Sequence, residues 1–426
     1  MEQFIVEGGR PLCGAVRVHG AKNAALPILA ATVLAAGEHE IDDVPDLLDI
    51  KVMVDILRAL GARVNRFGDR IVIDTTALGA THIPDDLMGQ MRSSIFLMGP
   101  LLARFREVSM TRPGGCAIGA RPIDLHLRGL RALGASIQAV NGVLSCYTRR
   151  LTGNTVILDF PSVGATENIM MAATLAQGVT EIVGAAKEPE VVDLQNFLNR
   201  MGARIRGAGT ETITVRGVHE LHPVSYTIIP DRIVAGTLCI GAAITRGSVL
   251  LKNVEPNHLK ALIHFLRQTG TKVEVTGDTL RVARSGPLKR IAKLATAPHP
   301  GFPTDMQAQM TALMTIADGT SIISETVFDG RFKHVNELMR MGADIVVDLQ
   351  SAFVRGVPYL SGAYVEAPDL RAGASLILAG LAAEGTTVVQ EIQHVDRGYE
   401  QLENLLSQLG AKIERVSAQP VTKSLK

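Results

Sequence analysis

One phrase recurs six times along the 426 residues and constrains the fold more than any other feature. It reads Leu-x-x-x-Gly-Ala, with Thr replacing the final Ala in the fourth copy. Its glycines are spaced 73, 68, 68, 72 and 68 residues apart, at Gly61, Gly134, Gly202, Gly270, Gly342 and Gly410. Such self-similarity is typical of repeat architectures, so we predict six structural units that together fill the chain.

Each copy of the phrase predicts the end of a helix followed by a hairpin. An apolar-periodic stretch precedes the glycine, as in Val52 to Leu60, and a glycine placed there commonly takes the left-handed conformation that ends a helix. The following residues alternate between apolar and polar around a pair such as Gly68 and Asp69. Alternation around Gly-Asp or Asn-Gly is typical of a β-hairpin.

A second helix in each unit is predicted to be buried on all sides, because runs such as Ala30 to Gly37 and Met170 to Gly178 have no polar face. In five units a glycine ends this helix and lies 23 to 25 residues before the glycine of the Leu-x-x-x-Gly-Ala phrase in the same unit. These five are Gly37, Gly178, Gly247, Gly319 and Gly385. The second unit has Ala103 to Arg106 there instead. We expect three-fold groups of units with these helices inside and sheets outside.

Chain length and the last repeat predict two domains. A chain of 426 residues exceeds the size at which one core keeps growing. The sixth unit has one strand after Gly410 and then a polar tail, so residues 3–19 are expected to supply its missing strands. This gives one domain of three units at 22–229, and a second of three units at 1–21 plus 230–426, with crossings near residues 21 and 230.

Composition excludes several classes of protein. The net charge of +1 offers no bulk field for nucleic acid or an anionic membrane, and 4% aromatic residues with no Trp argue against base stacking. No basic and apolar leader precedes the first unit, and no apolar run reaches membrane-spanning length. The four cysteines lack CxxC spacing. We expect a soluble cytoplasmic protein with free thiols, no metal and no cofactor.

Candidate functional residues gather where the buried helices are predicted to begin. These six starts are Lys22-Asn23, Arg92 to Ser94, Ser162 to Gly164, Asp231-Arg232, Thr304-Asp305 and Asp369 to Arg371. Ser162, Thr304 and Asp369 have an ordinary explanation as helix caps, and Thr304 with Gln307 fits a capping box.

Cations at these starts need another explanation, because they oppose the positive end of the helix dipole. A single one is more often a solvated surface charge. Four of them, at equivalent positions of four units, favour a receptor for an anion-rich ligand at helix N-termini. The four are Lys22, Arg92, Arg232 and Arg371.

Cys116 lies in a glycine-rich segment, after Pro113-Gly114-Gly115 and before Gly119, that suits neither a helix nor a strand interior. A thiol there could move onto a ligand and off again. A cysteine between glycines is by itself more often inert than catalytic. The segment continues, however, into Ala120 to His126, and with this continuation the sequence resembles a known family.

That family is the UDP-N-acetylglucosamine 1-carboxyvinyltransferases, or enolpyruvyl transferases, of the EPSP synthase superfamily. The resemblance runs from Phe4 to Arg415, and Phe160 stands where some members have a lysine that contacts the nucleotide. The shared motifs are Gly20 to Pro27, Met91 to Ile95, the Cys116 segment, Ser162 to Thr166, Glu188 to Asp193, Pro230 to Ile233, Thr296 to Pro300, Phe302 to Gln309, Glu325 to Phe328, Arg331, Asp369 to Arg371 and His394 to Tyr399.

The resemblance implies an α/β fold called an inside-out α/β barrel, with two domains of three βαβαββ units around buried parallel helices and an active site in the interdomain cleft. It implies transfer of the enolpyruvyl group of phosphoenolpyruvate to the 3-hydroxyl of UDP-N-acetylglucosamine through a tetrahedral ketal, with release of phosphate. This is the first committed step of peptidoglycan synthesis. The substrates are small molecules, and no obligate protein partner is implied.

The resemblance also assigns roles to residues of this sequence. Cys116 would donate a proton to the methylene carbon, form an adduct with phosphoenolpyruvate and react with fosfomycin, and Asp305 would take the hydroxyl proton. Lys22, Arg121 and Arg397 would hold phosphate, Lys22 and Arg397 counting among the catalytic groups, while Arg331 and Arg371 would hold the carboxylate, with Asn23 beside the phosphoenolpyruvate. The UDP-sugar would contact Asn23, Arg92, Arg121, Pro122, Ile123, Asp124, Leu125, Ser162, Val163, Gly164, Asp305 and Val327.

Two alternatives stay open. The related transferase that acts on shikimate 3-phosphate shares fold and donor, but lacks the Cys116 segment and the Gly20 to Pro27 form. A non-catalytic six-repeat binding protein could retain the anion site without turnover. His299 and His394 lie in shared motifs, and we expect both to be ordinary packed histidines.

Overall fold

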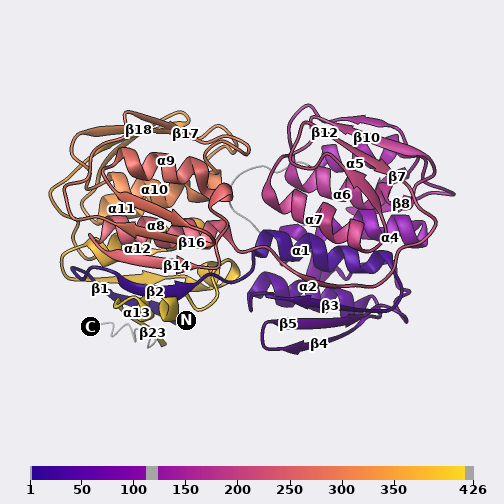
Figure 1. Cartoon of the computed structure of the whole chain (residues 1–426), viewed down its shortest axis with the longest axis horizontal. Helices are drawn as coiled ribbons and strands as arrows, with labels where there is room; N and C mark the ends of the chain where they lie inside the picture. The colour runs from indigo at the N-terminus through magenta and orange to yellow at the C-terminus, as the bar shows by residue number, and fades with distance from the viewer. Residues whose placement is uncertain (1, 112–122, 418–426) are drawn as a thin grey trace, which may run out of the picture. The chain divides into compact units, whose positions relative to one another are not determined.

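A computed structural model describes residues 2–111 and 123–417 of the chain. It contains two compact units (Figure 1), which we name the central unit, residues 19–111 and 123–231, and the terminal unit, residues 2–18 and 232–417. Each has its own apolar core.

Six separate sheets form among the described residues, and five share one pattern. Each of the five has four strands joined by one parallel pairing followed by two antiparallel pairings. The sixth has three antiparallel strands. The predicted mixed α/β class is thus confirmed, whereas separate sheets do not establish the barrel arrangement, which stays a prediction.

The central unit contains three of these sheets. In spatial order they are β13 (Ser225–Thr227), β3 (Glu38–Asp42), β5 (Arg70–Asp74), β4 (Arg63–Phe67); β6 (Glu107–Thr111), β8 (Val143–Tyr147), β7 (Ser136–Val140); and β11 (Arg204–Arg206), β12 (Thr212–Arg216), β10 (Val179–Val183), β9 (Thr155–Ile157).

The terminal unit contains the other three. They are β15 (Lys272–Thr276), β16 (Thr279–Ala283), β14 (Ser248–Lys252), β2 (Cys13–Arg17); β17 (Lys293–Ala295), β18 (Thr320–Ser324), β20 (Ser351–Arg355), β19 (Asp344–Asp348); and β21 (Tyr364–Glu366), β22 (Thr386–Gln390), β1 (Glu2–Glu7), β23 (Lys412–Ser417).

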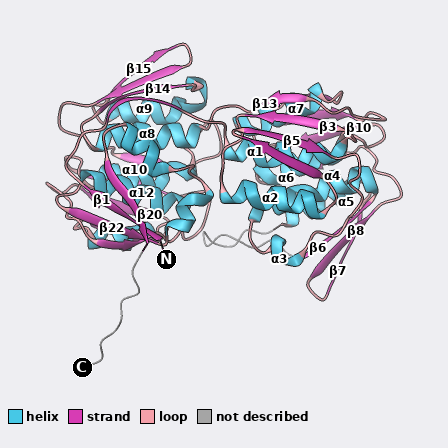
Figure 2. Ribbon diagram, turned by 90° about the horizontal axis from the view of Figure 1, so that it is seen from below, coloured by secondary structure: helices cyan, strands magenta, loops and turns pink. Residues whose placement is uncertain are grey.

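The predicted burial of one helix per repeat is confirmed. Every residue of α8 and α10 is buried, and Figures 1 and 2 show the helices of each unit enclosed by its strands. In the terminal unit α8, α10 and α12 pack on one another. The inner helices are α1 (Lys22–Ala31), α4 (Met98–Phe105), α6 (Val163–Ala173), α8 (Arg232–Ile244), α10 (Gln307–Met314) and α12 (Leu370–Ala382).

The remaining helices join the inner layer to the sheets. The α-helices are α2 (Leu48–Ala59), α3 (Asp85–Met88), α5 (Asp124–Ala132), α7 (Pro189–Arg200), α9 (Lys260–Gln268), α11 (His334–Arg340) and α13 (Leu402–Gln408). The 3-10 helices are η1 (Thr32–Leu34), η2 (Arg92–Leu97), η3 (Pro256–Leu259), η4 (Thr304–Met306) and η5 (Ile392–Arg397).

The left-handed helix ends predicted from the repeated phrase are also confirmed. All six of its glycines have φ between 86° and 106°, a conformation that a side chain disfavours. The second of the six repeats lacks the glycine that ends the buried helix in the other five. Arg106 takes the left-handed conformation there, with φ of 67° at the end of α4.

The N-terminal segment completes the sheet of the sixth repeat, as its missing strands predict. β1 lies between β22 and β23 and pairs antiparallel with both. Phe4 and Val6 are fully buried in the terminal unit. β2, next along the chain, pairs in parallel with β14 of the fourth repeat.

None of the helices within the described ranges is long and apolar enough to span a membrane.

Gly356 allows a backbone approach that any side chain would block. A Cβ there would lie 1.6 Å from the Ala317 carbonyl oxygen, whereas a Cβ at exposed Gly286, in the same unit, would meet nothing within 4 Å. We therefore expect Gly356→Ala to lower the free energy of unfolding by about 2 kcal/mol or more through overpacking.

Thermal denaturation of both variants would check this. Gly286→Ala is the control, and its midpoint should equal or slightly exceed that of wild type, because alanine restricts the unfolded chain. Equal midpoints for the two variants would contradict the close approach of residues 317 and 356.

Candidate active site

The predicted site residues fall into two groups, one in each unit. The terminal unit carries Asp305, Val327, Arg331, Arg371 and Arg397, and the central unit carries Lys22, Asn23, Arg92, Ile123, Asp124, Leu125, Ser162, Val163 and Gly164. Cys116, Arg121 and Pro122 lie outside the described residues. Each group is therefore considered within its own unit.

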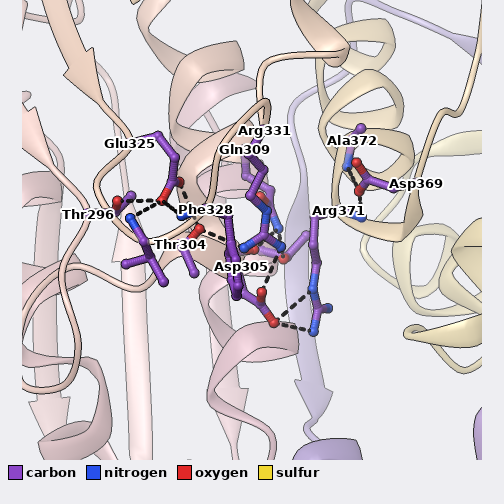
Figure 3. Close-up of polar contacts among 12 residues, drawn as sticks. Thr296, Thr304, Asp305, Gln309, Glu325, Phe328, Arg331, Asp369, Arg371 and Ala372 are labelled. Atoms are coloured by element: carbon purple, nitrogen blue, oxygen red, sulfur yellow. Dashed lines mark hydrogen bonds and ion pairs between the residues drawn. The ribbon is translucent and has the colours of Figure 1, made fainter. Parts of the chain in front are cut away.

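Asp305, Arg331 and Arg371 form an acid–arginine cluster in the terminal unit (Figure 3). Arg331 Nη2 lies 2.7 Å from Asp305 Oδ1, and Arg371 Nη2 lies 2.9 Å from Oδ2. The arginine side chains are only 5% and 3% exposed, while that of Asp305 is 27% exposed. Two nearly buried guanidinium groups thus converge on a carboxylate that solvent reaches.

Thr304 links the cluster to Glu325. Its hydroxyl donates to Glu325 Oε2 over 2.7 Å and accepts from Arg331 Nη1 over 2.6 Å. The capping box predicted for Thr304 and Gln307 is wrong, because these two partners engage the hydroxyl, Pro303 occupies the N-cap position, and the buried Gln307 amide makes no hydrogen bond.

Glu325 also fixes the segment that carries Val327. Its Oε1 accepts from Thr296 Oγ1 over 2.8 Å and from the backbone N–H groups of Val327 and Phe328 over 2.9 and 3.1 Å. The sequence pattern assigns no role to Glu325. The one local signal is an acidic residue directly after the partly buried strand β18, and this does not identify its hydrogen-bond partners.

A buried polar network lies behind the cluster. Gln309 Nε2 is 3.1 Å from the Asp305 carbonyl and 3.0 Å from the Tyr399 hydroxyl, which is 3.0 Å from Thr237 Oγ1. The Arg371 guanidinium lies over the Tyr399 ring, 5.3 Å from its centroid, a cation–π arrangement. Gln309 of α10, Thr237 of α8 and Tyr399, two residues after η5, thereby help to hold Asp305 and Arg371 in place.

In the central unit, Lys22 at the start of α1 is a predicted site cation, and it forms an ion pair with an acidic residue. Its Nζ lies 3.1 Å from Asp49 Oδ2, and both side chains are largely buried. Its backbone N–H donates to Asp231 Oδ2 over 3.1 Å, so Asp231 provides a cap for α1. The sequence did not predict these acidic partners, which are 27 and 209 residues away.

A helix begins at each of the six predicted starts. In four repeats it is the buried α-helix itself, α1, α6, α8 or α12. In the second and fifth repeats the 3-10 helices η2 and η4 begin there, and the buried helices α4 and α10 start only at Met98 and Gln307. Two of the three predicted caps are confirmed. Ser162 Oγ accepts from Ala165 N over 3.4 Å, and Asp369 Oδ1 accepts from Arg371 N and Ala372 N over 2.8 and 3.0 Å.

Arg397 ends η5 and is half-buried. The preceding residue, Asp396, forms two hydrogen bonds with Arg415, of 2.6 and 2.9 Å. Arg415 also contacts Glu403 at 2.7 Å and Glu2 at 3.0 Å. The segment that presents Arg397 is thus tied to strands at both ends of the chain.

Within residues 2–111 and 123–417, no three His, Cys, Asp or Glu side chains are grouped so that they could hold a metal ion.

The sequence of residues 6–406 matches the model of the family described as EPSP synthase (3-phosphoshikimate 1-carboxyvinyltransferase). The chain belongs to the EPSP synthase family. It is therefore a transferase of the carboxyvinyl type, as the resemblance implied.

Relatives within this family are similar over nearly their full length. The chain is 52% identical to UDP-N-acetylglucosamine 1-carboxyvinyltransferase 2 of Caldanaerobacter subterraneus subsp. tengcongensis, covering 98% of this chain and 100% of that one. It is 53% identical to the protein of the same name from Carboxydothermus hydrogenoformans, with the same coverage.

A solved structure shows the same fold. The enolpyruvyl transferase NikO from Streptomyces tendae superposes with a TM-score of 0.88 at 27% sequence identity, covering 98% of this chain and 99% of that one. This match shows that nearly the whole chain has the α/β fold of that enzyme.

The three described cysteines differ in access. Cys13 is exposed, whereas Cys146 and Cys239 are buried, and burial raises the pKa of their thiols to about 11 and about 12. Since the thiolate is the nucleophile, we expect iodoacetamide at pH 8 to label Cys13 in the folded protein and to leave both buried cysteines unmodified.

Peptide mapping by mass spectrometry would measure this labelling. The same reaction in guanidinium chloride is the control and should label all three cysteines. Rapid labelling of Cys239 in the folded protein would contradict the packing of α8.

Proposed function

We propose that this protein transfers the enolpyruvyl group of phosphoenolpyruvate to the 3-hydroxyl of UDP-N-acetylglucosamine and releases phosphate, the first committed step of peptidoglycan synthesis. The observation that carries the proposal is the acid–arginine cluster in a chain more than 50% identical to proteins named for this reaction. A cytoplasmic location, small-molecule substrates and action without a protein partner are part of the proposal.

The donor carries a carboxylate and a phosphate, and the cluster suits the first of these. Arginine presents parallel N–H groups that fork onto a carboxylate. In this structure Arg331 and Arg371 direct those groups at Asp305. We therefore propose that the substrate carboxylate takes over part of these contacts, which frees an oxygen of Asp305 to accept the proton of the sugar hydroxyl.

Lys22, Arg121 and Arg397 would bind the phosphate of phosphoenolpyruvate, with Asn23 beside them. Lys22 is a compact charge that can exchange one anion for another, so the phosphate would compete with Asp49 for its Nζ. Such an exchange keeps the buried ammonium paired throughout, and so avoids the cost of leaving a charge unpaired.

The reaction proceeds by addition and elimination. The sugar oxygen bonds to C2 of phosphoenolpyruvate as Asp305 takes its proton, and the methylene carbon gains a proton from Cys116. The resulting tetrahedral ketal then loses phosphate and a proton from the methyl carbon, which restores the double bond. A thiol with an ordinary pKa near 8.5 is still largely protonated at neutral pH and can serve as this acid.

The UDP-sugar would rest mainly on the central unit. Its diphosphate suits the start of α6, where backbone N–H groups and the helix dipole favour an anion. Arg92 adds a cation at the start of η2. The complete proposed set is Asn23, Arg92, Arg121, Pro122, Ile123, Asp124, Leu125, Ser162, Val163, Gly164, Asp305 and Val327.

The phosphate-release assay tests the function directly. With phosphoenolpyruvate and UDP-N-acetylglucosamine we expect wild type to release phosphate, and Cys116→Ser to lose most of that activity because a serine hydroxyl is a much weaker acid than a thiol. Shikimate 3-phosphate serves as the control acceptor and should give no release.

Release with shikimate 3-phosphate alone would identify the other transferase of the family. Calorimetric binding of the UDP-sugar without any turnover would instead identify a binding protein.

The cluster predicts a separate loss of donor affinity. Arg331→Lys keeps the charge but removes the fork that reaches both Thr304 and Asp305, so we expect KM for phosphoenolpyruvate to rise about tenfold or more. Steady-state kinetics at saturating UDP-sugar would measure it.

The matched control is Arg340→Lys in the same unit. Arg340 is exposed and forms an ion pair with Glu337 of its own helix, at 3.4 Å. Its KM should stay at the wild-type value. A KM for Arg331→Lys equal to that of the control would remove Arg331 from the donor site.

A further inference from the structure

Asn168 is a fully buried polar residue inside α6. Asparagine is an unfavourable residue in a helix interior, and a buried amide costs free energy unless its hydrogen-bonding groups are satisfied. Asn168 meets this requirement, but with partners from two other segments. It therefore links α6 to those segments.

The amide of Asn168 makes three contacts. Its Oδ1 accepts from the Gly99 backbone N–H over 2.6 Å, and its Nδ2 donates to the Ile95 carbonyl over 2.7 Å and to His126 Nδ1 over 3.1 Å. A backbone N–H can only donate and a carbonyl can only accept. These two contacts therefore fix which end of the amide is oxygen and which is nitrogen.

The orientation of this amide also determines the tautomer of His126. Because Nδ2 donates, Nδ1 of the ring must accept, and the neutral ring carries its proton on Nε2. Burial, with a smaller contribution from the charge of Arg92, lowers the pKa of His126 to about 3, so the ring is neutral at pH 7.

The same ring packs against the start of α6. A Cβ at Gly164 would lie 3.1 Å from His126 Cε1 and 3.3 Å from Nε2. The ring edge that carries the proton therefore lies beside Gly164. α4 approaches α6 even more closely, since a Cβ at Gly99 would lie 2.3 Å from the Asn168 carbonyl oxygen and 2.5 Å from Asn168 Oδ1.

The Asn168 side chain thus joins α6 to two other chain segments. Ile95 belongs to η2, which begins at Arg92, and His126 directly follows the stretch 123–125. The start of α6, at residues 162–164, precedes Asn168 in the same helix, and the His126 ring packs against it at Gly164. These are the three described segments of the central unit that hold most of the proposed UDP-sugar contacts.

We propose that Asn168 is a positioning residue for the UDP-sugar, which sets the spacing of these three segments without touching the ligand. The inference rests on the proposed function, because that function supplies the ligand. Its physical basis is that a site built from separate segments works only when their spacing is held to a fraction of an ångström. α4, α5 and α6, which bear these segments, are labelled in Figure 1.

The test uses Asn168→Asp, which keeps the shape of the side chain and removes the Nδ2 donor. The change places a carboxylate oxygen beside the Ile95 carbonyl oxygen, where no hydrogen bond can form. It also requires His126 Nδ1 to donate a hydrogen bond instead of accepting one. We expect the Kd for UDP-N-acetylglucosamine, measured by calorimetry, to rise about tenfold or more. The KM for phosphoenolpyruvate at saturating UDP-sugar should change less than about threefold.

Thr174→Val is the matched control. Thr174 is fully buried at the end of the same helix, and its hydroxyl donates over 2.7 Å to Met171 of that helix. Its replacement should leave the Kd unchanged. If Asn168→Asp does not yield folded protein, Asn168→Ser is measured in the same way and judged by the same criteria.

A wild-type Kd in the Asn168 variant, or an equal loss for both substrates, would overturn the positioning role. Failure of the proposed function gives a different result. Wild type that binds the UDP-sugar but releases no phosphate would refute the reaction and still allow the positioning role to be judged. Wild type that does not bind the UDP-sugar would refute both.

Discussion

Burial of the inner helices on every side is the constraint on which the rest of the structure depends. A helix such as α8, with no exposed residue, can present polar groups to a ligand only at its ends. The beginnings of these helices carry unsatisfied N–H groups and positive dipole charge. Groups that bind an anion are therefore expected at these ends. Lys22 and Arg371 lie at the starts of α1 and α12, and Arg92 lies at the start of η2, which leads into α4.

Two of the cations at these ends, Lys22 and Arg371, are balanced by acids of the protein itself. Asp49 pairs with Lys22, and Asp305 pairs with both Arg331 and Arg371. The protein thereby avoids buried unpaired charges, while retaining groups that an incoming anion can recruit by exchange. Internal carboxylates therefore occupy the groups that are predicted to receive an anion, and the sequence pattern does not predict this pairing.

The repeat pattern predicted much of the fold because each signal was local. The spacing of the six glycines, the apolar helices and the incomplete last repeat located the helix starts, the left-handed ends and the strand at residues 2–7. Partnerships between repeats could not be obtained in this way. Glu325, Gln309 and Asn168 acquire their roles from contacts with segments distant in the sequence. The prediction of a Thr304 capping box is wrong because the Thr304 hydroxyl forms hydrogen bonds with Arg331 and Glu325 instead. Family resemblance, and not periodicity, supplied the roles of individual site residues.

β1 pairs with β22 and β23, which follow it by several hundred residues in the chain. A ribosome produces residues 2–7 long before residues 386–390 and 412–417, so the strand at the centre of that sheet must wait for both neighbours. The central unit lies wholly between these events, and its two ends meet where Asp231 N donates to the His19 carbonyl over 2.9 Å. It can therefore close while the chain is still growing, whereas the terminal unit must pair strands across almost the full sequence, which slows folding.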